Sequence, residues 1–227
     1  GRVLVGFRER SSPFLADMRV CHVLDPRVGE RLDALSELVG SLDASDRIAQ
    51  IEVACDDDHC ALAFRHLDPL SEADQERLIA FGRSSGLWIQ LQPAGPDSIH
   101  PLYPEQQPLY FQPLADESLR IAFKISDFTQ VNAGINRQMV ARALDKLDLA
   151  PEHRVLDLFC GLGNFTLPMA RRCASVTGVE GDQAMVDRAR ENARALGIDN
   201  TGYHAADLTR VDGSEEWLRQ RYDRILL

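Results

Sequence analysis

The sequence predicts an α/β protein in which a smaller α+β domain precedes a Rossmann-like domain, and three observations support this prediction. From residue 128 onward, segments with strand character alternate with helical segments, which is typical of a parallel sheet covered by helices. A loop that contains Gly161 and Gly163 separates an apolar strand from a helix in that region. Before residue 128, β-rich runs and helical patterns occur together. We therefore expect an α+β domain over residues 1–127 and a Rossmann-like domain over residues 128–227.

The first predicted domain contains two helices and several strands. Apolar residues recur with helical spacing over residues 30–42, and Ser71 is a favourable N-cap for a second helix that runs to about residue 84. Two β-rich runs flank an acidic turn and predict a hairpin. The strands of this domain are expected at residues 47–54, 61–67, 87–91 and 119–125. Residues 93–113 are rich in proline and glutamine, so we expect them to be irregular.

The second predicted domain begins with a helix at residues 135–147. Strands are then expected at residues 154–159, 175–180, 201–204 and 222–227, and helices at residues 164–172, 183–196 and 214–220. The chain ends in a predicted buried strand, and such a strand in a parallel sheet normally leads into a loop that carries chemistry. We therefore expect a fragment of a longer protein, holding only the N-terminal half of the Rossmann-like domain.

Composition places the chain among ordinary globular proteins. It has 227 residues, of which 44% are hydrophobic, and no apolar run approaches the roughly 20 residues of a membrane span. No secretory signal pattern is present at the start. The five cysteines are odd in number and irregularly spaced, which argues against a disulfide framework and for a reducing compartment. We expect a cytoplasmic protein with no membrane partner.

The charge argues against RNA binding by this chain alone. Its net charge is −10 and is unevenly distributed, because residues 1–127 hold 12 basic and 21 acidic side chains and residues 128–227 hold 13 and 14. Since affinity for RNA depends on basic groups that neutralise phosphates, an acidic chain needs a basic surface from elsewhere to bind RNA.

The loop after residue 156 indicates a nucleoside cofactor. Asp157 ends an apolar run, Gly161 and Gly163 follow, and Glu180 ends the next predicted strand, where an acid suits a ribose diol. A dinucleotide site would need a third small residue, which is missing here. Asp157 would also repel a pyrophosphate, whereas it suits the amino group and sulfonium of S-adenosylmethionine (SAM). A dinucleotide site and a plain strand-to-helix turn remain as alternatives.

Three segments resemble the RNA uracil-5-methyltransferase family, most closely its branch that modifies 23S ribosomal RNA. These are Phe-Thr-Gln-Val-Asn at residues 128–132, Asp-Leu-Phe-Cys-Gly-Leu-Gly-Asn-Phe-Thr at residues 157–166, and Gly-Val-Glu at residues 178–180. The resemblance extends from about residue 7 to residue 227. It implies SAM-dependent methylation of uracil C5 in 23S ribosomal RNA by the full-length protein.

The resemblance also implies which residues contact SAM. Gln130, Phe159 and Asn164 match family positions that contact the cofactor, Glu180 matches the ribose-binding acid, and Asp207 falls where the family contacts the adenine edge. Three of these residues have a structural alternative. Gln130 would otherwise be a surface or capping residue, Phe159 a core residue and Asp207 a helix cap.

Cys21 is the candidate metal ligand. In the ribosomal RNA branch of the family, a [4Fe-4S] cluster takes three cysteines from an upstream segment and a fourth at this position, so we expect the cluster in the full-length protein but not in this chain. Without the resemblance, Cys21 would be a buried core cysteine. Cys55, His59 and Cys60 surround an acidic turn without a fourth ligand nearby, so we expect a structural hairpin rather than a zinc site.

The family chemistry requires groups that we do not expect in this chain. Uracil C5 is a weak nucleophile, and in the family a cysteine thiolate adds to C6 before C5 attacks the methyl group, after which a carboxylate base removes the C5 proton. The family nucleophile, base and N-terminal RNA-binding module match no residue here, and Cys160 is a poor nucleophile candidate. We therefore expect weak SAM binding without methylation. The rival functions are methylation of a small molecule or another nucleobase atom, and a non-catalytic SAM- or nucleotide-binding module.

Overall fold

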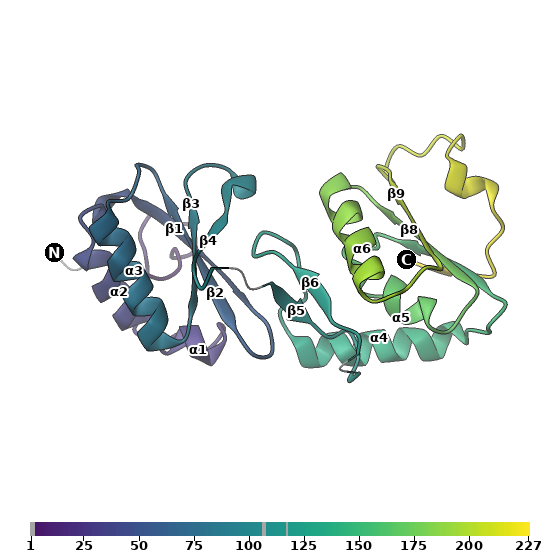
Figure 1. The fold of residues 1–227 in the computed structure, drawn as a ribbon, viewed down its shortest axis with the longest axis horizontal. Helices are drawn as coiled ribbons and strands as arrows, with labels where there is room; N and C mark the ends of the chain where they lie inside the picture. Colours follow the sequence, from purple (N-terminus) through teal and green to yellow (C-terminus); the bar gives the residue numbers. More distant parts are fainter. Residues whose placement is uncertain (1–2, 106–107, 117) are drawn as a thin grey trace. The chain divides into compact units, whose positions relative to one another are not determined.

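The computed structural model describes residues 3–105, 108–116 and 118–227 and divides the chain into two compact units between Leu109 and Tyr110 (Figure 1). The sequence predicted the division after residue 127. Below, unit 1 denotes the described residues up to Leu109, and unit 2 those from Tyr110 to Leu227.

Unit 1 is an α+β fold around a four-stranded sheet of order β1-β2-β3-β4. Its strands are β1 (Ile48–Cys55), β2 (Cys60–His66), β3 (Trp88–Gln92) and β4 (His100–Tyr103). Its helices are α1 (Pro26–Gly29), α2 (Leu32–Ser41) and α3 (Glu72–Ser85), with short 3-10 helices η1 (Ser45–Arg47) and η2 (Pro96–Ser98). β1 and β2 form the predicted antiparallel hairpin. β2 and β3 pair in parallel and are connected by α3, and β3 and β4 are antiparallel. In Figure 1, α2 and α3 lie together on one side of this sheet.

The core of unit 1 follows from the apolar spacing of its elements. Leu62 and Phe64 on β2 point into one cluster together with Leu35 of α2 and Leu78 of α3, and all four are almost completely buried. Ser71 accepts a hydrogen bond from the N–H of residue 74, so the predicted N-cap of α3 is confirmed.

Asp74, in the first turn of α3, is fully buried and anchors the chain that precedes η1. Its two carboxylate oxygens accept hydrogen bonds from the N–H groups of Asp43 (2.8 Å) and Ala44 (3.0 Å), and Arg77 donates to it at 2.6 Å. Burial alone would raise the pKa of Asp74, but these donors outweigh burial and hold it below its ordinary value. Asp74 is therefore ionised in the folded protein, and its carboxylate holds the chain before η1 against α3.

The prediction that residues 93–113 are irregular was wrong in part. β4 and β5 (Leu109–Phe111) lie within this segment, while Gln106 and Gln107 lie outside the described residues. β4 is the last strand of its sheet, and the edge of a sheet tolerates a residue such as Pro101 that has no N–H to donate. Pairing with β3 thus overrides the local composition.

Unit 2 contains the predicted parallel sheet, with strand order β10-β7-β8-β9. Its strands are β7 (Arg154–Leu158), β8 (Ser175–Glu180), β9 (Thr201–Ala205) and β10 (Arg224–Leu226). Its helices are α4 (Ala133–Leu147), α5 (Thr166–Ala170) and α6 (Gln183–Ala195). Residues 214–220, predicted as a helix, form only the 3-10 helix η3 (Glu216–Arg219), and β5 and β6 (Ile121–Phe123) form a separate two-stranded sheet. In chain order this sheet reads 3-2-1-4 from β9 to β10, which matches four of the six strands of a Rossmann-type sheet.

Both faces of the parallel sheet are covered, because apolar side chains of its strands point to both sides. Successive residues point to opposite faces, so Val155 and Val176 pack with α4 and α5. Leu156 and Val179 pack on the other face against Trp217 of η3.

The segment between β5 and α4 belongs to unit 2 because of three contacts with α6. The backbone N–H and C=O of Ala122 bond to the side chain of Asn192 at 2.9 and 3.0 Å. Asp127, almost fully buried, forms an ion pair with Arg188. These contacts join residues 122 and 127, which the sequence placed in the first domain, to α6 of unit 2.

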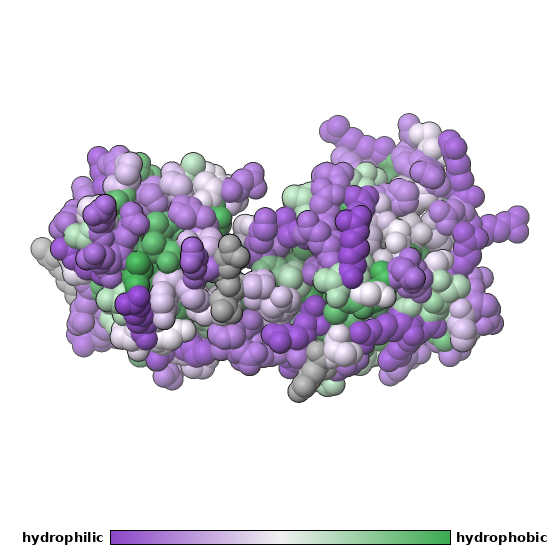
Figure 2. Space-filling model, in the orientation of Figure 1, coloured by the Kyte–Doolittle hydropathy of each residue, from purple (hydrophilic) through white to green (hydrophobic). Residues whose placement is uncertain are grey.

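The surface of both units is largely hydrophilic on the face drawn in Figure 2, as expected for a chain with the composition of a globular protein. Within the described residues, no helix combines the length and the apolar character that crossing a lipid bilayer demands.

Candidate functional site

The candidate site lies at the carboxyl ends of the parallel strands of unit 2. The chain passes from β7 to β8 and β9 in one direction and then returns to β10 on the other side of β7. In open α/β sheets, ligands bind outside the carboxyl ends of the strands near such a reversal. Phe159, Gly161, Gly163 and Asn164 all lie on the loop that follows β7, at this edge.

The loop after β7 has an unusual backbone. Phe159, Gly161 and Gly163 have φ angles of 60°, 53° and 96°, in the region that favours glycine. A Cβ atom on Gly163 would also lie 2.9 Å from the side chain of Leu167. Phe159 is 60% exposed, so the predicted alternative of a core residue does not hold. A phenylalanine held in this conformation is strained, and strain of this kind is concentrated at functional sites.

Glu180, at the end of β8, is held against this loop. Its carboxylate accepts hydrogen bonds from the N–H of Gly161 at 3.0 Å and of Gly181 at 2.7 Å. Its backbone C=O accepts from the N–H of Ala206 at 2.9 Å, which brings the segment after β9 alongside. The sequence-predicted loop, acid and third strand end therefore converge.

Asp157 is placed differently from the expectation that it faces an amino group and a sulfonium. Its side chain is 1% exposed and accepts a hydrogen bond from the hydroxyl of Thr166, at the start of α5. Burial raises the pKa of Asp157 to about 7, the Thr166 hydroxyl opposes this shift, and nearby Glu180 adds to it. Asp157 therefore lies beneath the loop, where it is bonded to the protein.

Asn164 makes a reciprocal contact that the sequence analysis missed. Its amide N–H donates to the side-chain oxygen of Asn136 at 2.9 Å, and the amide of Asn136 donates back at 2.9 Å. Asn136 is 4% exposed and lies on α4, four residues after the N-cap Asn132. Gln130 is exposed on the segment that leads into α4. A polar residue on the apolar face of a predicted helix was the available signal for Asn136.

Asp207 lies on the exposed segment after β9. One of its oxygens accepts hydrogen bonds from the N–H (2.9 Å) and hydroxyl (2.6 Å) of Thr209. The Thr209 hydroxyl, followed by its N–H, holds the pKa of Asp207 below its ordinary value. Asp207 is thus an ionised side chain that caps a turn close to Glu180.

Cys160 has the properties of a packing residue. It is 2% exposed, and its sulfur would lie 2.8 Å from a Cβ atom on Gly178, so the two residues are mutually fitted. Burial, and then the carboxylates of Asp157 and Glu180, raise the pKa of the Cys160 thiol well above its ordinary range. Because the thiolate is the nucleophile, Cys160 is unsuited to that role, as predicted. Cys173 is also buried, with its thiol directed to the C=O of Met169 at 3.2 Å.

Cys21 lies in the core of unit 1. It is 9% exposed, and its N–H donates to the C=O of Gly29 at 2.9 Å. Cys55 and Cys60, the other cysteines of that unit, are bonded to each other. A [4Fe-4S] cluster needs four ligands, so the described part of unit 1 offers one thiol and does not form a cluster site by itself.

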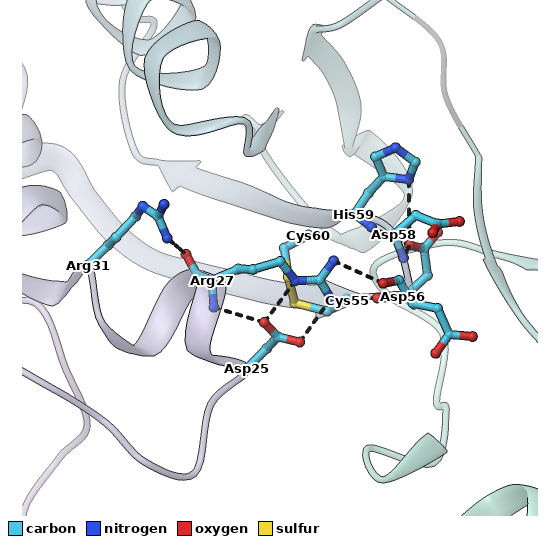
Figure 3. A network of polar contacts seen from close by, with 9 residues as sticks. Asp25, Arg27, Arg31, Cys55, Asp56, Asp58, His59 and Cys60 are labelled. Carbon is cyan, nitrogen blue, oxygen red and sulfur yellow. Dashed lines mark hydrogen bonds and ion pairs between the residues drawn. A yellow bond between two sulfur atoms is a disulfide. The ribbon is translucent and has the colours of Figure 1, made fainter. Parts of the chain in front are cut away.

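The expectation of no disulfide was wrong for Cys55 and Cys60. They form the last pair of the β1–β2 hairpin, with their Cα atoms 4.0 Å apart, and a disulfide joins them. Figure 3 shows Arg27 of α1 reaching to this hairpin, where it donates to the C=O of Asp56 at 2.6 Å, while Asp25 forms an ion pair with it at 2.9 Å. The spacing of the cysteines along the sequence did not predict this disulfide, because it depends on the register of β1 and β2.

The chain is similar in sequence to known uracil methyltransferases. The family model for tRNA (uracil-5-)-methyltransferase matches residues 110–217. The chain is 50% identical to 23S rRNA (uracil(1939)-C(5))-methyltransferase RlmD of Alcanivorax borkumensis and 51% identical to RlmD of Alkalilimnicola ehrlichii. Both alignments cover 100% of this chain and 51% of the relative, so the chain spans about half the length of the curated relatives it matches.

One solved structure has the same fold over nearly the whole chain. It is the Pyrococcus abyssi tRNA (uracil-54, C5)-methyltransferase in complex with S-adenosyl-L-homocysteine, with a TM-score of 0.68 and 16% identity. The match covers 98% of this chain and 55% of that one.

Proposed function

We propose that this chain is the SAM-binding part of an enzyme that methylates uracil C5 in 23S ribosomal RNA, because the chain belongs to the RlmD family of 23S rRNA uracil-C5 methyltransferases. The observation that carries the proposal is the convergence of the glycine loop on Glu180 at the carboxyl edge of the parallel sheet. A carboxylate there can accept hydrogen bonds from both hydroxyls of a ribose.

The remaining predicted contacts fit SAM around this anchor. Asp207, close to Glu180, would contact the adenine edge, and the exposed ring of Phe159 would lie against the cofactor. Gln130 and Asn164 would bind the amino-acid end. Asp157, bonded to Thr166, would support the loop from beneath the bound cofactor.

The cysteines of the chain support the proposal that it does not transfer a methyl group to uracil C5 by itself. Addition to uracil C6 needs a thiolate that the base can reach. Cys21, Cys160 and Cys173 are buried, and Cys55 and Cys60 form a disulfide. We assign no catalytic residue within the chain, and the nucleophile and base would belong to the rest of the full-length protein.

The RNA contacts and the cluster are also proposed for the full-length protein. With 35 acidic and 25 basic residues, the chain needs a basic surface elsewhere to bind 23S ribosomal RNA. Cys21 would supply one thiolate to a [4Fe-4S] cluster whose other ligands lie outside the chain. A ribosomal RNA substrate implies a cytoplasmic protein.

Calorimetric titration of the full chain with S-adenosylhomocysteine tests the SAM site. Glu180→Gln removes a charged acceptor while keeping the size, so we expect an affinity at least about tenfold lower. Glu191→Gln, which makes the same charge change at an exposed position of α6, is the matched control and should bind like the wild type. Equal affinities of the wild type and Glu180→Gln would contradict the assignment.

A methylation assay tests the argument from the cysteines. The purified chain is incubated with methyl-labelled SAM and a uridine-containing fragment of 23S ribosomal RNA. We expect no label in the RNA, because no cysteine of the chain is an accessible thiolate. Formation of 5-methyluridine would refute this part of the proposal.

A further inference from the structure

We infer that Asn136 is a positioning residue of the SAM site, which orients the amide of Asn164 toward the cofactor; this inference rests on the proposed function. The two side chains bond reciprocally at 2.9 Å in both directions. Asn136 comes from α4 and Asn164 from the loop after β7, so the pair joins two segments 28 residues apart in sequence.

The reciprocal pair couples the orientation of the Asn164 amide to that of Asn136. A carboxamide has two N–H donors and one oxygen with two lone pairs. The contact with Asn136 uses one N–H and one lone pair of Asn164, which leaves one donor and one lone pair for a ligand. If the amide of Asn164 alone rotated by half a turn, donor would meet donor and acceptor would meet acceptor. Asn136 therefore holds the side chain of Asn164 in place, and the orientations of the two amides are coupled.

The loop that carries Asn164 needs such a support. Phe159, Gly161 and Gly163 all have positive φ angles, and strained backbone persists only where its surroundings hold it. α4 is a firm support because Val140 and Leu144, on its inner face, are buried in the core of unit 2.

Asn136 also relates the loop to the other predicted arm of the site. Asn132 caps α4 by accepting the N–H of Ile135 at 2.9 Å, and Gln130 lies two residues before this cap. Through Asn136, the helix that follows Gln130 is bonded to the loop that carries Asn164. The two groups proposed for the amino-acid end of SAM are thereby held in one arrangement.

The Asn136→Asp variant distinguishes a positioning role of Asn136 from a purely structural one. A neutral carboxylic acid has one donor and one acceptor, like the amide face it replaces, whereas a carboxylate has no donor. Burial raises the pKa of a carboxyl group, so the neutral form is populated at mildly acidic pH. We expect S-adenosylhomocysteine to bind the variant at least about tenfold more weakly than the wild type at pH 8, and within about threefold of it at pH 5.5.

Two controls make this pH profile specific. The wild type is titrated in parallel, because Asp157, Cys160 and Glu180 lie on the elements around the pair and Arg137 is adjacent on α4. The matched variant is Asn192→Asp, since Asn192 is also buried and makes two bonds of the same kind, to the backbone of Ala122. It should lose stability at pH 8 while its affinity follows the wild type.

Each outcome decides between the inference and the function on which it rests. A wild type that does not bind S-adenosylhomocysteine would refute the proposed function and this inference with it. A wild type that binds, with Asn136→Asp equal to it at both pH values, would refute the inference alone, as would a loss in Asn192→Asp with the same pH profile. If Asn136→Asp does not fold, Asn136→Ser replaces it. We then expect a loss of affinity for S-adenosylhomocysteine that does not depend on pH. An affinity equal to that of the wild type would refute the inference.

Discussion

Replacing Asp157 by asparagine should make unit 2 more stable at pH 8 and abolish part of its pH dependence. Asp157 is buried, and its pKa is raised from 3.8 to about 7. A carboxyl group whose pKa is raised by folding stabilises the fold in its neutral form. This stability is fully present below the unfolded pKa and is lost as the pH rises through the folded pKa.

The size of the effect follows from the two pKa values. Each pH unit between them contributes about 1.36 kcal/mol, so ionising Asp157 in the folded state removes roughly 4 kcal/mol in total. About half to two-thirds of this loss falls between pH 5 and pH 8. Asparagine keeps an acceptor for the Thr166 hydroxyl and does not titrate, so the variant should lack this loss.

Urea unfolding between pH 5 and pH 8 measures the difference. The chain has two tryptophans, and in a Trp88→Phe background the buried Trp217 reports on unit 2 alone. Asp207→Asn is the control, because Asp207 is exposed and its lowered pKa keeps it ionised over this range. The wild type should lose about 2–3 kcal/mol more than Asp157→Asn. Parallel curves for the two proteins would refute the assignment of a buried, neutral carboxyl group.

Three further predictions concern packing and cross-links. Gly178→Ala should destabilise unit 2 by about 1–3 kcal/mol in urea unfolding, because the new methyl group would lie 2.8 Å from the sulfur of Cys160; an unchanged midpoint would show that the core can adjust. Asp74→Asn should destabilise unit 1 by roughly 2–3 kcal/mol, followed by tryptophan fluorescence, since an amide cannot accept at both positions where the carboxylate accepts an N–H. Reducing the disulfide between Cys55 and Cys60 should lower the stability of unit 1 by about 2 kcal/mol in the same assay, and a double serine variant should be insensitive to the reductant.

Local sequence signals predicted most elements of the fold. Apolar spacing located α2 and α4, and Ser71 marked the start of α3 within one residue. Predictions failed where partners distant in sequence decide the conformation. β4 forms because β3 offers an edge, and residues 214–220 form only a 3-10 turn, η3, whose Trp217 packs on the sheet.

In the candidate site, too, predictions succeeded where the local sequence decides the structure and failed where contacts between elements decide it. The sequence placed the glycine loop and Glu180 correctly relative to the sheet, because strand ends in a parallel sheet share one edge. It did not predict that Asp157 is buried or that Asn136 supports Asn164, since both facts depend on side-chain contacts between elements. The disulfide was missed for the same reason, because it depends on strand register.

The hydrogen bonds to Glu180 have an entropic consequence for ligand affinity. A glutamate side chain that is free to rotate loses roughly 1.5–2 kcal/mol of conformational entropy when it is fixed. In this chain, the N–H groups of Gly161 and Gly181 hold the carboxylate at both of its oxygens. Much of that entropy is therefore lost when the protein folds and not when a ribose binds. Folding of unit 2 thus prepares a rigid acceptor, and a diol that reaches it gains affinity from contacts that need no further ordering.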